Sequence, residues 1–208
     1  MAYSGASNRL PAHLSATHLS SAQLPTAVKL LVAGGFGVGK TTFVGSVSEI
    51  EPLSTEELIT EASAGIDSLD GVGGKTTTTV AFDFGRLSLS PDLMLYMFGT
   101  PGQDRFWFMW DELSTGALGA VVLADTRRLD GCFGAVDFFE RRGIKFVVAV
   151  NEFDGAFRYD PDEIRSALEI KPNVPVTLCD ARDPRSATAV LVTLVRYLIN
   201  SAIFTSPV

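Results

Sequence analysis

The sequence predicts an α/β fold: a doubly wound, mostly parallel sheet of about six strands with one antiparallel edge strand and helices on both faces. Short apolar runs alternate along the chain with segments of helical periodicity, and most of these runs are apolar throughout rather than at every second residue. Strands of that composition are buried on both faces, which is typical of a parallel sheet between two layers of helices. The 208 residues, 46% of them apolar, are enough for one such domain with an extension.

The predicted elements follow one another in a regular order. Val28–Ala33 is a predicted strand, and a helix is expected over Lys40–Val47, directly after a group of glycines. Thr79–Leu89 and Leu93–Phe98 are two predicted strands joined by a turn at Ser90-Pro91-Asp92, and this hairpin adds the antiparallel strand. The remaining predicted strands are Ala120–Ala124, Ile144–Val150 and Val174–Leu178, and the last predicted helix is Ala187–Ile199.

Two stretches fall outside this alternation. Residues 1–25 are rich in Ser, Ala, His and Leu, and we expect a flexible extension there, before a single domain over residues 26–208. Residues 51–78 are polar, lack a clear period and carry glycines at positions 65, 71, 73 and 74, so a long loop is expected. A loop of that length in a compact domain is usually functional or disordered.

Charge and cysteine content exclude several classes of function. The formal net charge is −7 and no basic run exceeds the pairs Arg127–Arg128 and Arg141–Arg142, which argues against binding of nucleic acid. The two cysteines, Cys132 and Cys179, show no CxxC spacing and are expected to be reduced thiols of a cytoplasmic protein. We find no secretory signal, lipidation motif or apolar stretch of membrane-spanning length, so no direct membrane anchor is expected.

The segment from Gly34 to Thr41 predicts a phosphate-binding loop. Its residues match the pattern GxxxxGK[ST] and stand between an apolar strand and a helix, as that motif requires. Backbone N–H groups of the turn and the start of the helix would converge on the phosphates of a nucleotide. Lys40 would contact the β- and γ-phosphates and act in catalysis, and the Thr41 hydroxyl would bind Mg²⁺. The predicted contact residues are Gly35, Phe36, Gly37, Val38, Gly39, Lys40, Thr41 and Thr42.

The segment Asn151-Glu152-Phe153-Asp154 predicts recognition of guanine. It follows an apolar strand, at the position where an NKxD motif would fall. An ionised Asp154 only accepts hydrogen bonds, and guanine offers two adjacent donors where adenine has a ring acceptor. Asn151 would brace the loops around the base. Glu152 replaces the lysine whose alkyl stem covers the base, so guanine preference is expected to survive with reduced affinity.

Together these motifs resemble those of the Ras/Arf superfamily of small GTPases, over residues 26–200. The segment from Thr79 to Phe84 is similar to the first switch of Rab-type proteins, which implies that Thr79 acts in catalysis and contacts Mg²⁺ and the γ-phosphate. The neighbouring threonines at 76–78 leave that register open by one residue. The segment Gly99-Thr100-Pro101-Gly102-Gln103 resembles the second switch, DxxGQ.

This resemblance implies further contact residues. In the second switch, the Gly102 N–H would meet the γ-phosphate and Gln103 would orient the attacking water. The segment Cys179–Arg182 resembles the short SAK-type loop of the superfamily, in which the N–H at Ala181 would meet the guanine carbonyl. The predicted contact residues of that loop are Asp180, Ala181 and Arg182.

Two residues depart from the superfamily pattern. Gly99 stands where the second switch begins with an aspartate, so the carboxylate that supports Mg²⁺ is expected to be missing. Phe36 stands where Ras has a glycine close to the γ-phosphate. The TPGQ sequence is similar to that of bacterial gliding-motility GTPases and of the conservon-encoded GTP-binding proteins of filamentous bacteria, and the NEFD variant fits the latter better. That group implies a roadblock-type regulatory protein and a membrane-associated sensor assembly as partners, which would recruit the chain to the membrane.

The resemblance implies a GTPase switch in signalling, with GTP or GDP and Mg²⁺ as ligands. Slow hydrolysis, accelerated by a partner, is expected because Phe36 crowds the site and no internal arginine finger is evident. One alternative is a nucleotide-binding scaffold subunit of a sensor complex with little or no hydrolysis. Another is a small-molecule kinase, which Asn151 and Asp154 disfavour.

Three further features have structural and functional interpretations. The aromatic run Phe106–Trp110 fits packing on the sheet and partner binding about equally. Asp125, after a predicted strand, is expected to be a turn or cap residue rather than a metal ligand. Arg127 and Arg128 are expected to be surface charges.

Overall fold

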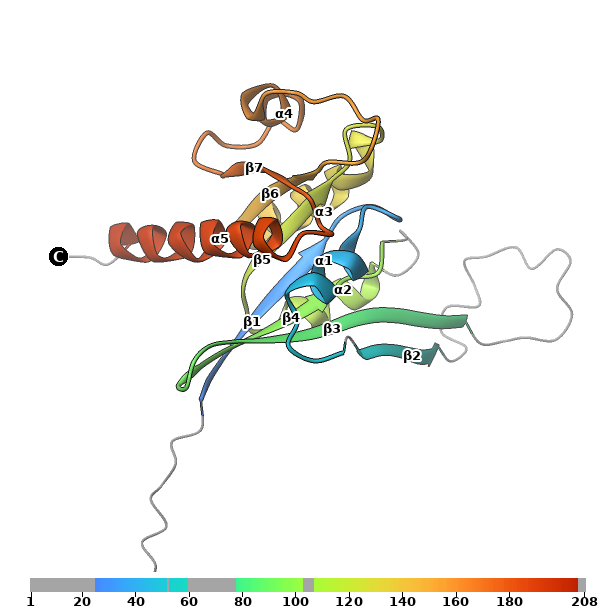
Figure 1. Cartoon of the computed structure of the whole chain (residues 1–208). Helices are drawn as coiled ribbons and strands as arrows, with labels where there is room; N and C mark the ends of the chain where they lie inside the picture. Colours follow the sequence, from blue (N-terminus) through green and yellow to red (C-terminus); the bar gives the residue numbers. More distant parts are fainter. Residues whose placement is uncertain (1–24, 52, 60–77, 103–106, 206–208) are drawn as a thin grey trace, which may run out of the picture.

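The framework of the fold is one sheet of seven strands (Figure 1). The structure is a computed structural model and describes residues 25–51, 53–59, 78–102 and 107–205. The strands are β1 (Thr26–Ala33), β2 (Leu53–Ile59), β3 (Thr78–Ser90), β4 (Leu93–Gly99), β5 (Ala117–Ala124), β6 (Phe146–Asn151) and β7 (Val176–Cys179). Their order in the sheet is β2-β3-β4-β1-β5-β6-β7.

All neighbouring strands from β4 to β7 are parallel, whereas β3 runs antiparallel to both β2 and β4. β3 also carries one extra residue, Leu89, between the pairs Ser88–Met94 and Ser90–Leu93. Such a bulge bends a strand and shifts its pairing by one residue. The predicted mostly parallel sheet with one antiparallel strand is therefore confirmed.

The predicted loop over residues 51–78 is wrong in part, because Leu53–Ile59 forms β2 and Thr78 begins β3. β2 adds a seventh strand and makes β3 the second strand from the edge rather than the edge itself. A strand that pairs on one side only needs no continuous apolar run, and charged residues such as Glu56 and Glu57 are common on sheet edges. The predicted extension, residues 1–25, lies outside the described residues except for Pro25.

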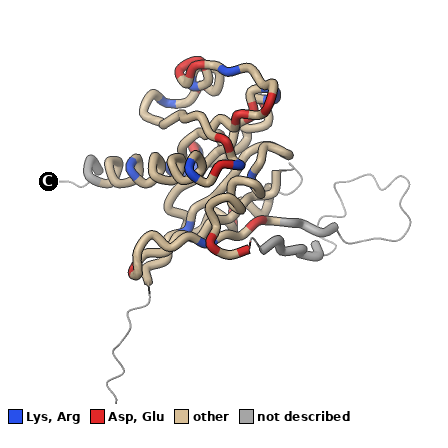
Figure 2. Tube along the Cα trace, in the orientation of Figure 1, with Lys and Arg blue, Asp and Glu red and all other residues tan. Residues whose placement is uncertain are grey.

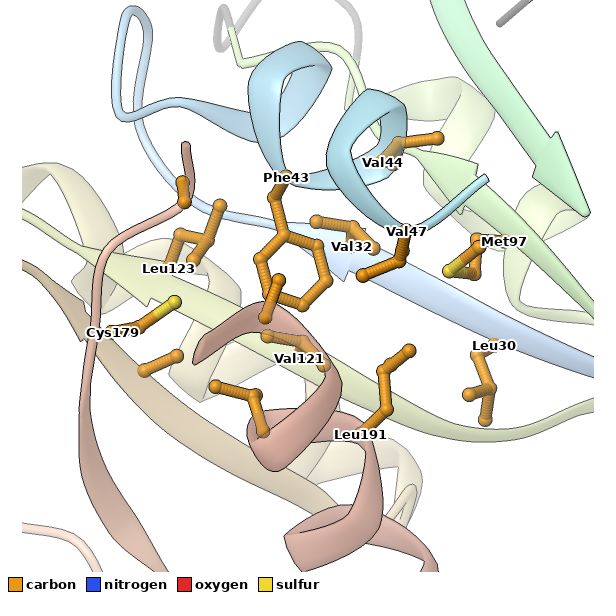
Figure 3. Close-up of a cluster of buried hydrophobic side chains, with 14 of the residues drawn as sticks. Leu30, Val32, Phe43, Val44, Val47, Met97, Val121, Leu123, Cys179 and Leu191 are labelled. Carbon is orange, nitrogen blue, oxygen red and sulfur yellow. The ribbon is translucent and has the colours of Figure 1, made fainter. Parts of the chain in front are cut away.

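Helices cover the sheet on both faces, as the sequence predicts. They are α1 (Lys40–Val47), α2 (Phe108–Ser114), the 3-10 helix η3 (Leu129–Cys132), α3 (Phe133–Arg142), α4 (Pro161–Ala167) and α5 (Pro184–Thr205). On one face α1 and α5 contact the sheet through a cluster that includes Phe43, Leu191 and Val121, shown in Figure 3. On the other face, Trp110 of α2, Phe139 of α3 and Ile164 of α4 belong to a second cluster. Within the described part of the chain, no helix has the length and hydropathy needed to cross a membrane.

The alternation of side chains along β1 explains the two clusters. Leu30 and Val32 belong to the cluster under α1 and α5, whereas Leu31 and Ala33 belong to the cluster under α2, α3 and α4. All four residues are fully buried. Successive strand residues point to opposite faces, so a run without polar residues marks a strand covered on both sides.

Because β1, β4, β5, β6 and β7 are parallel, their carboxyl ends meet at one edge of the sheet. The phosphate loop follows β1, and the segment from Thr100 follows β4. Asp125, Glu152 and Asp180 directly follow β5, β6 and β7. Charged residues of both signs gather near these ends and around α4 (Figure 2). Every loop that the sequence assigns to nucleotide binding, within the described residues, therefore lies along this edge.

Candidate functional site

The loop between β1 and α1 has a backbone that only glycine allows at two positions. Gly34 has φ 133° and Gly39 has φ 103°, values that residues with a Cβ atom rarely adopt. A Cβ on Gly34 would lie 2.3 Å from the carbonyl oxygen of Leu123, and one on Gly39 would lie 2.7 Å from Nδ2 of Asn151. These glycines let the loop turn tightly between β5 and the loop after β6.

Lys40 lies inside this loop. Its Nζ donates hydrogen bonds to the carbonyl oxygens of Gly34 (2.8 Å) and Gly35 (2.7 Å). Burial lowers the pKa of Lys40 to about 8, although the nearby Asp83 carboxylate acts in the opposite direction. Gly102 lies directly beside the ammonium group, since a Cβ there would lie 2.5 Å from Nζ. The structure thus brings the phosphate loop and Thr100-Pro101-Gly102, called the TPG segment below, together around the ammonium group of Lys40.

The position that the missing aspartate would occupy holds a carboxylate from another strand. Asp83 of β3 is 9% exposed, and its Oδ2 accepts a hydrogen bond from the Thr41 hydroxyl at 2.8 Å. A Cβ on Gly99 would lie 2.9 Å from that same oxygen. A carboxylate therefore does lie at this place, and its support of Mg²⁺ stays a prediction. Asp83 reaches this place from β3, and the absence of a side chain at Gly99 leaves the room.

Sequence reasoning missed Asp83 because the relevant neighbour lies on a different strand. Phe84 of β3 pairs with Phe98 of β4, so the next residue along each strand brings Asp83 opposite Gly99. The sequence feature that could have indicated Asp83 is an acidic residue between Phe82 and Phe84, within a strand that is predicted to be buried. Among the described residues, no group of three or more His, Cys, Asp or Glu side chains is arranged to hold a metal ion.

Asn151 joins the phosphate loop to the loop after β7. Its Nδ2 donates to the carbonyl oxygen of Val38 at 2.9 Å, and its Oδ1 accepts from the N–H of Ala181 at 3.0 Å. Asn151 is only 6% exposed, so both polar ends of the carboxamide need partners. The side chain braces the loops as the sequence predicts, while its contact with a nucleotide stays a prediction.

The Ala181 N–H has a different partner from the one expected. It donates to Asn151 rather than pointing into the site for a base carbonyl. The physical reason is that the buried carboxamide oxygen of Asn151 needs a donor, and Ala181, 1% exposed, supplies it. In this structure Ala181 therefore acts as a brace between loops.

The charged residues around the expected base position form three ion pairs. Arg182 contacts both carboxylate oxygens of Asp154 at 3.2 and 3.3 Å, and also binds Asp180. The hydrogen bonds from Arg182 lower the pKa of Asp180. Glu152 pairs with Arg158 at 2.9 Å, so a cation still lies beside the position where the superfamily has lysine. A cavity of about 390 Å³ lies among these residues, lined mainly by the segment from Val150 to Tyr159 with Asp180 and Arg182.

The TPG segment is fixed by a buried tryptophan. The Trp110 indole N–H donates to the carbonyl oxygen of Pro101 at 3.2 Å, and Trp110 is only 2% exposed. Trp107 stacks on Trp110 with 5.4 Å between ring centroids, yet Trp107 and Phe108 remain 36% and 57% exposed. Of the described rings in this run, Trp110 thus packs in the core and Trp107 and Phe108 lie at the surface, and their use in partner binding stays a prediction.

The remaining predicted residues are placed as follows. Thr42 is exposed at the start of α1, and Phe36 is 69% exposed at the phosphate loop beside Gly37. Thr79 lies in β3 opposite Leu58, so its role toward Mg²⁺ stays a prediction. Gln103 lies outside the described residues.

Both cysteines are buried and unpaired. Burial raises the pKa of Cys132 to about 12 and that of Cys179 to about 11. A thiol that stays protonated at neutral pH is a poor nucleophile and a poor metal ligand. The cysteines therefore belong to the core rather than to the site.

Solved structures with the same fold include G domains of iron transporters. The cytosolic domain of the T. maritima FeoB iron transporter in apo form matches with a TM-score of 0.59 and 17% identity, over 83% of this chain and 64% of that domain. The FeoB G domain of Methanococcus jannaschii matches with a TM-score of 0.55 and 14% identity, over 83% of this chain and 98% of that domain. At these identities the likeness establishes the fold, a P-loop NTPase G-domain fold.

Sequence comparison gives a relative and a family. The uncharacterized protein MJ1339 of Methanocaldococcus jannaschii is 34% identical over 101 residues, which cover 49% of this chain and 53% of that protein. The chain thus spans about half the length of the curated relative it matches. These comparisons do not distinguish the conservon-type group, which stays a prediction. The model of the family described as "Conserved hypothetical ATP binding protein" matches residues 32–201, and the chain belongs to that family.

Proposed function

We propose that this chain binds GTP and GDP with Mg²⁺ and hydrolyses GTP to GDP and phosphate, acting as a molecular switch. The observation that carries the proposal is the position of Asn151, which links Val38 of the phosphate loop to Ala181. The loop expected to hold phosphates and the loops expected to surround the base are therefore one unit. The G-domain fold supports the same conclusion.

Asp154 is the reason to prefer guanine, although the family description names ATP. A carboxylate accepts two hydrogen bonds, which matches the ring N1–H and exocyclic amine of guanine and opposes the N1 acceptor of adenine. A site built to satisfy such donors can discriminate by a factor on the order of 10⁴. Asp154 is 89% exposed at its side chain and is held by Arg182, so it is available to a ligand that enters beside it.

Thr41 and Asp83 fit a magnesium ion. Hydroxyl and carboxylate oxygens are the donors that Mg²⁺ prefers, usually together with phosphate oxygens and water. Thr41 already donates to Asp83 at 2.8 Å, which leaves lone pairs of the hydroxyl oxygen for a cation. Mg²⁺ bound there, with Thr79 as a further ligand by resemblance, would neutralise charge on the phosphate oxygens.

Different residues of the chain would serve different roles in hydrolysis. Lys40, held between Gly34, Gly35 and Gly102, would place positive charge against the β- and γ-phosphates. Gly102 and Gln103 would contact the γ-phosphate and orient water, by resemblance to the second switch. We expect slow turnover of the isolated chain, because Phe36 lies exposed at the phosphate loop.

We also propose that a partner accelerates this reaction. Trp107 and Phe108 next to the TPG segment give an exposed aromatic surface suited to a partner. By resemblance, that partner is a roadblock-type regulatory protein within a membrane-associated sensor assembly, and the chain itself is cytoplasmic. The scaffold alternative predicts no release of phosphate from GTP in single-turnover assays with or without candidate partners.

A nucleotide competition titration tests the proposal. A fluorescent GDP analogue bound to the chain would be displaced by GDP, GTP, ADP or ATP, with and without Mg²⁺. We expect guanine nucleotides to compete far better than adenine nucleotides, and Lys40→Ala to weaken GDP binding by at least about 30-fold. Lys171→Ala, an exposed lysine after α4, is the matched control. Equal competition by ADP and GDP would refute the guanine assignment, and stronger competition by ATP would favour the kinase alternative.

A further inference from the structure

Asp125 is a buried carboxylate between the two halves of the candidate nucleotide site. It directly follows β5 and is 3% exposed. Its Oδ1 accepts from the Arg127 N–H and from Arg127 Nε, and its Oδ2 from Arg127 Nη2, all at 2.9 Å. Asp125 closes a turn, as the sequence predicts, but the same contacts also fix Arg127, which was expected to be a plain surface charge.

The neighbouring Arg128 contacts both Asp125 and the phosphate loop. Arg128 Nη2 lies 3.7 Å from Asp125 Oδ2 and donates to the carbonyl oxygen of Phe36 at 3.3 Å. The backbone of the same segment lies against the loop, because a Cβ on Gly35 would lie 3.0 Å from the carbonyl oxygen of Gly131. The segment that begins at Asp125 therefore supports the outer side of the phosphate loop.

Arg127 contacts the loop after β6, which is expected to bind the base. The guanidinium carbon of Arg127 lies 4.0 Å from the centroid of the Phe153 ring, a cation–π contact. Phe153 stands between Glu152 and Asp154. The adjacent Thr126 hydroxyl donates to the carbonyl oxygen of Phe157 at 2.9 Å. Two contacts thus hold the segment from Phe153 to Phe157 against the end of β5.

We propose that Asp125 is a positioning residue for both ends of the nucleotide, holding the phosphate loop through Arg128 and the base-reading loop through Arg127. This proposal rests on the nucleotide binding proposed above. The bidentate contact between Asp125 and Arg127 has a defined geometry, and the ion pair at 3.7 Å places Arg128 beside the same carboxylate. The hydrogen bonds from Arg127 lower the pKa of Asp125, so the carboxylate stays ionised at neutral pH.

The proposal predicts that the two arginines act on different parts of the ligand. GMP lacks the β-phosphate. The ratio of the Kd values for GMP and GDP therefore measures how much the contact between the phosphate loop and the β-phosphate contributes to affinity. IDP lacks the exocyclic amine of guanine, so the ratio of the Kd values for IDP and GDP measures the contact with Asp154. Losing one positioning contact should reduce the corresponding ratio by about 5- to 10-fold.

The experiment measures the dissociation constants of GDP, GMP and IDP by displacement of a fluorescent GDP analogue. We expect Arg128→Ala to lower the GMP/GDP ratio and leave the IDP/GDP ratio unchanged. Arg127→Ala should do the reverse, and Asp125→Asn should lower both ratios. Arg128→Lys can still donate to the Phe36 carbonyl and should restore the GMP/GDP ratio. Arg141→Ala, which removes an exposed arginine paired with Asp137 on α3, is the control.

The outcomes separate this proposal from the proposed function. If the wild-type chain does not bind GDP, the proposed function fails. If it binds GDP but both ratios stay at wild-type values in all three variants, or move together in each single arginine variant, Asp125 does not position the two loops. Arg127 and Arg128 side chains are 45% and 58% exposed, so their alanine variants should fold and decide the question even if Asp125→Asn does not.

Discussion

Replacing Asp83 with alanine removes the carboxylate that accepts the Thr41 hydroxyl at 2.8 Å. A Mg²⁺ ion ligated by that hydroxyl oxygen would lie within about 5 Å of the carboxylate. The attraction at that distance is about 2 kcal/mol at the dielectric constant of water and about 7 kcal/mol at an effective value of 20. Asp83 is nearly buried at 9% exposure, but removing such a supporting group usually costs only about 10- to 100-fold in metal affinity. We expect a loss in that range.

The Gly99 position allows a stringent version of this test. Gly99→Asp alone should be harmful, because its Cβ would lie 2.9 Å from Asp83 Oδ2. Combined with Asp83→Ala, the same change places a carboxylate on the opposite strand, and we expect it to restore most of the Mg²⁺ affinity. The assay is a Mg²⁺ titration of the retention of a fluorescent GTP analogue. Asp92→Ala, in the exposed turn between β3 and β4, is the control. Unchanged Mg²⁺ affinity in Asp83→Ala would refute the reasoning.

Three further predictions concern the base, the phosphate and the aromatic surface. Asp154→Asn presents one donor and one acceptor, so it should exchange guanine preference for xanthine preference, measured by competition between GDP and XDP. Burial lowers the Lys40 pKa to about 8, whereas bound phosphates would keep Lys40 protonated. Affinity for GDP should therefore fall by up to about tenfold per pH unit above pH 8, and Lys40→Arg, which stays charged, should remove that slope between pH 7 and 9. Gly134→Ala should displace Trp107, because the new Cβ would lie 2.1 Å from its ring, and shift tryptophan fluorescence to the red. Gly131→Ala, with an ordinary contact of 3.6 Å, should leave the emission unchanged.

The parts of the site that are contiguous in sequence could be predicted from it. The phosphate loop needs glycines at fixed positions, and Gly34 and Gly39 adopt the positive φ values that explain them. The layered fold was predictable for a similar reason, since residues such as Leu30 to Ala33 are apolar without interruption because both faces of β1 are covered. Strand β2 was not predicted, because an edge strand does not need a continuous apolar run.

What could not be predicted depends on neighbours that are distant in sequence. Asp83 acts beside Gly99 only because β3 and β4 are antiparallel in one particular register. The partners of Asp125 are set by how the segment after β5 meets the phosphate loop and the loop after β6. The Ala181 N–H donates to the side chain of Asn151, thirty positions away. None of these contacts leaves a pattern in a single segment.

The extra residue at Leu89 has a consequence far from where it lies. If Leu89 paired with Met94 instead of bulging, the register set by Ser90 and Leu93 would continue along the hairpin, and Phe84 instead of Asp83 would stand across from Gly99. An aromatic ring would then occupy the place of the acid, and the acid would turn toward the opposite side of the sheet. One irregular position near a surface turn, about 20 Å from Gly99 at 3.3 Å per residue, therefore selects which chemical group the Thr41 hydroxyl meets. Deleting Leu89 should therefore remove the bulge and leave Asp83 across from Gly99, because Ser90 would still pair with Leu93 and Ser88 with Met94.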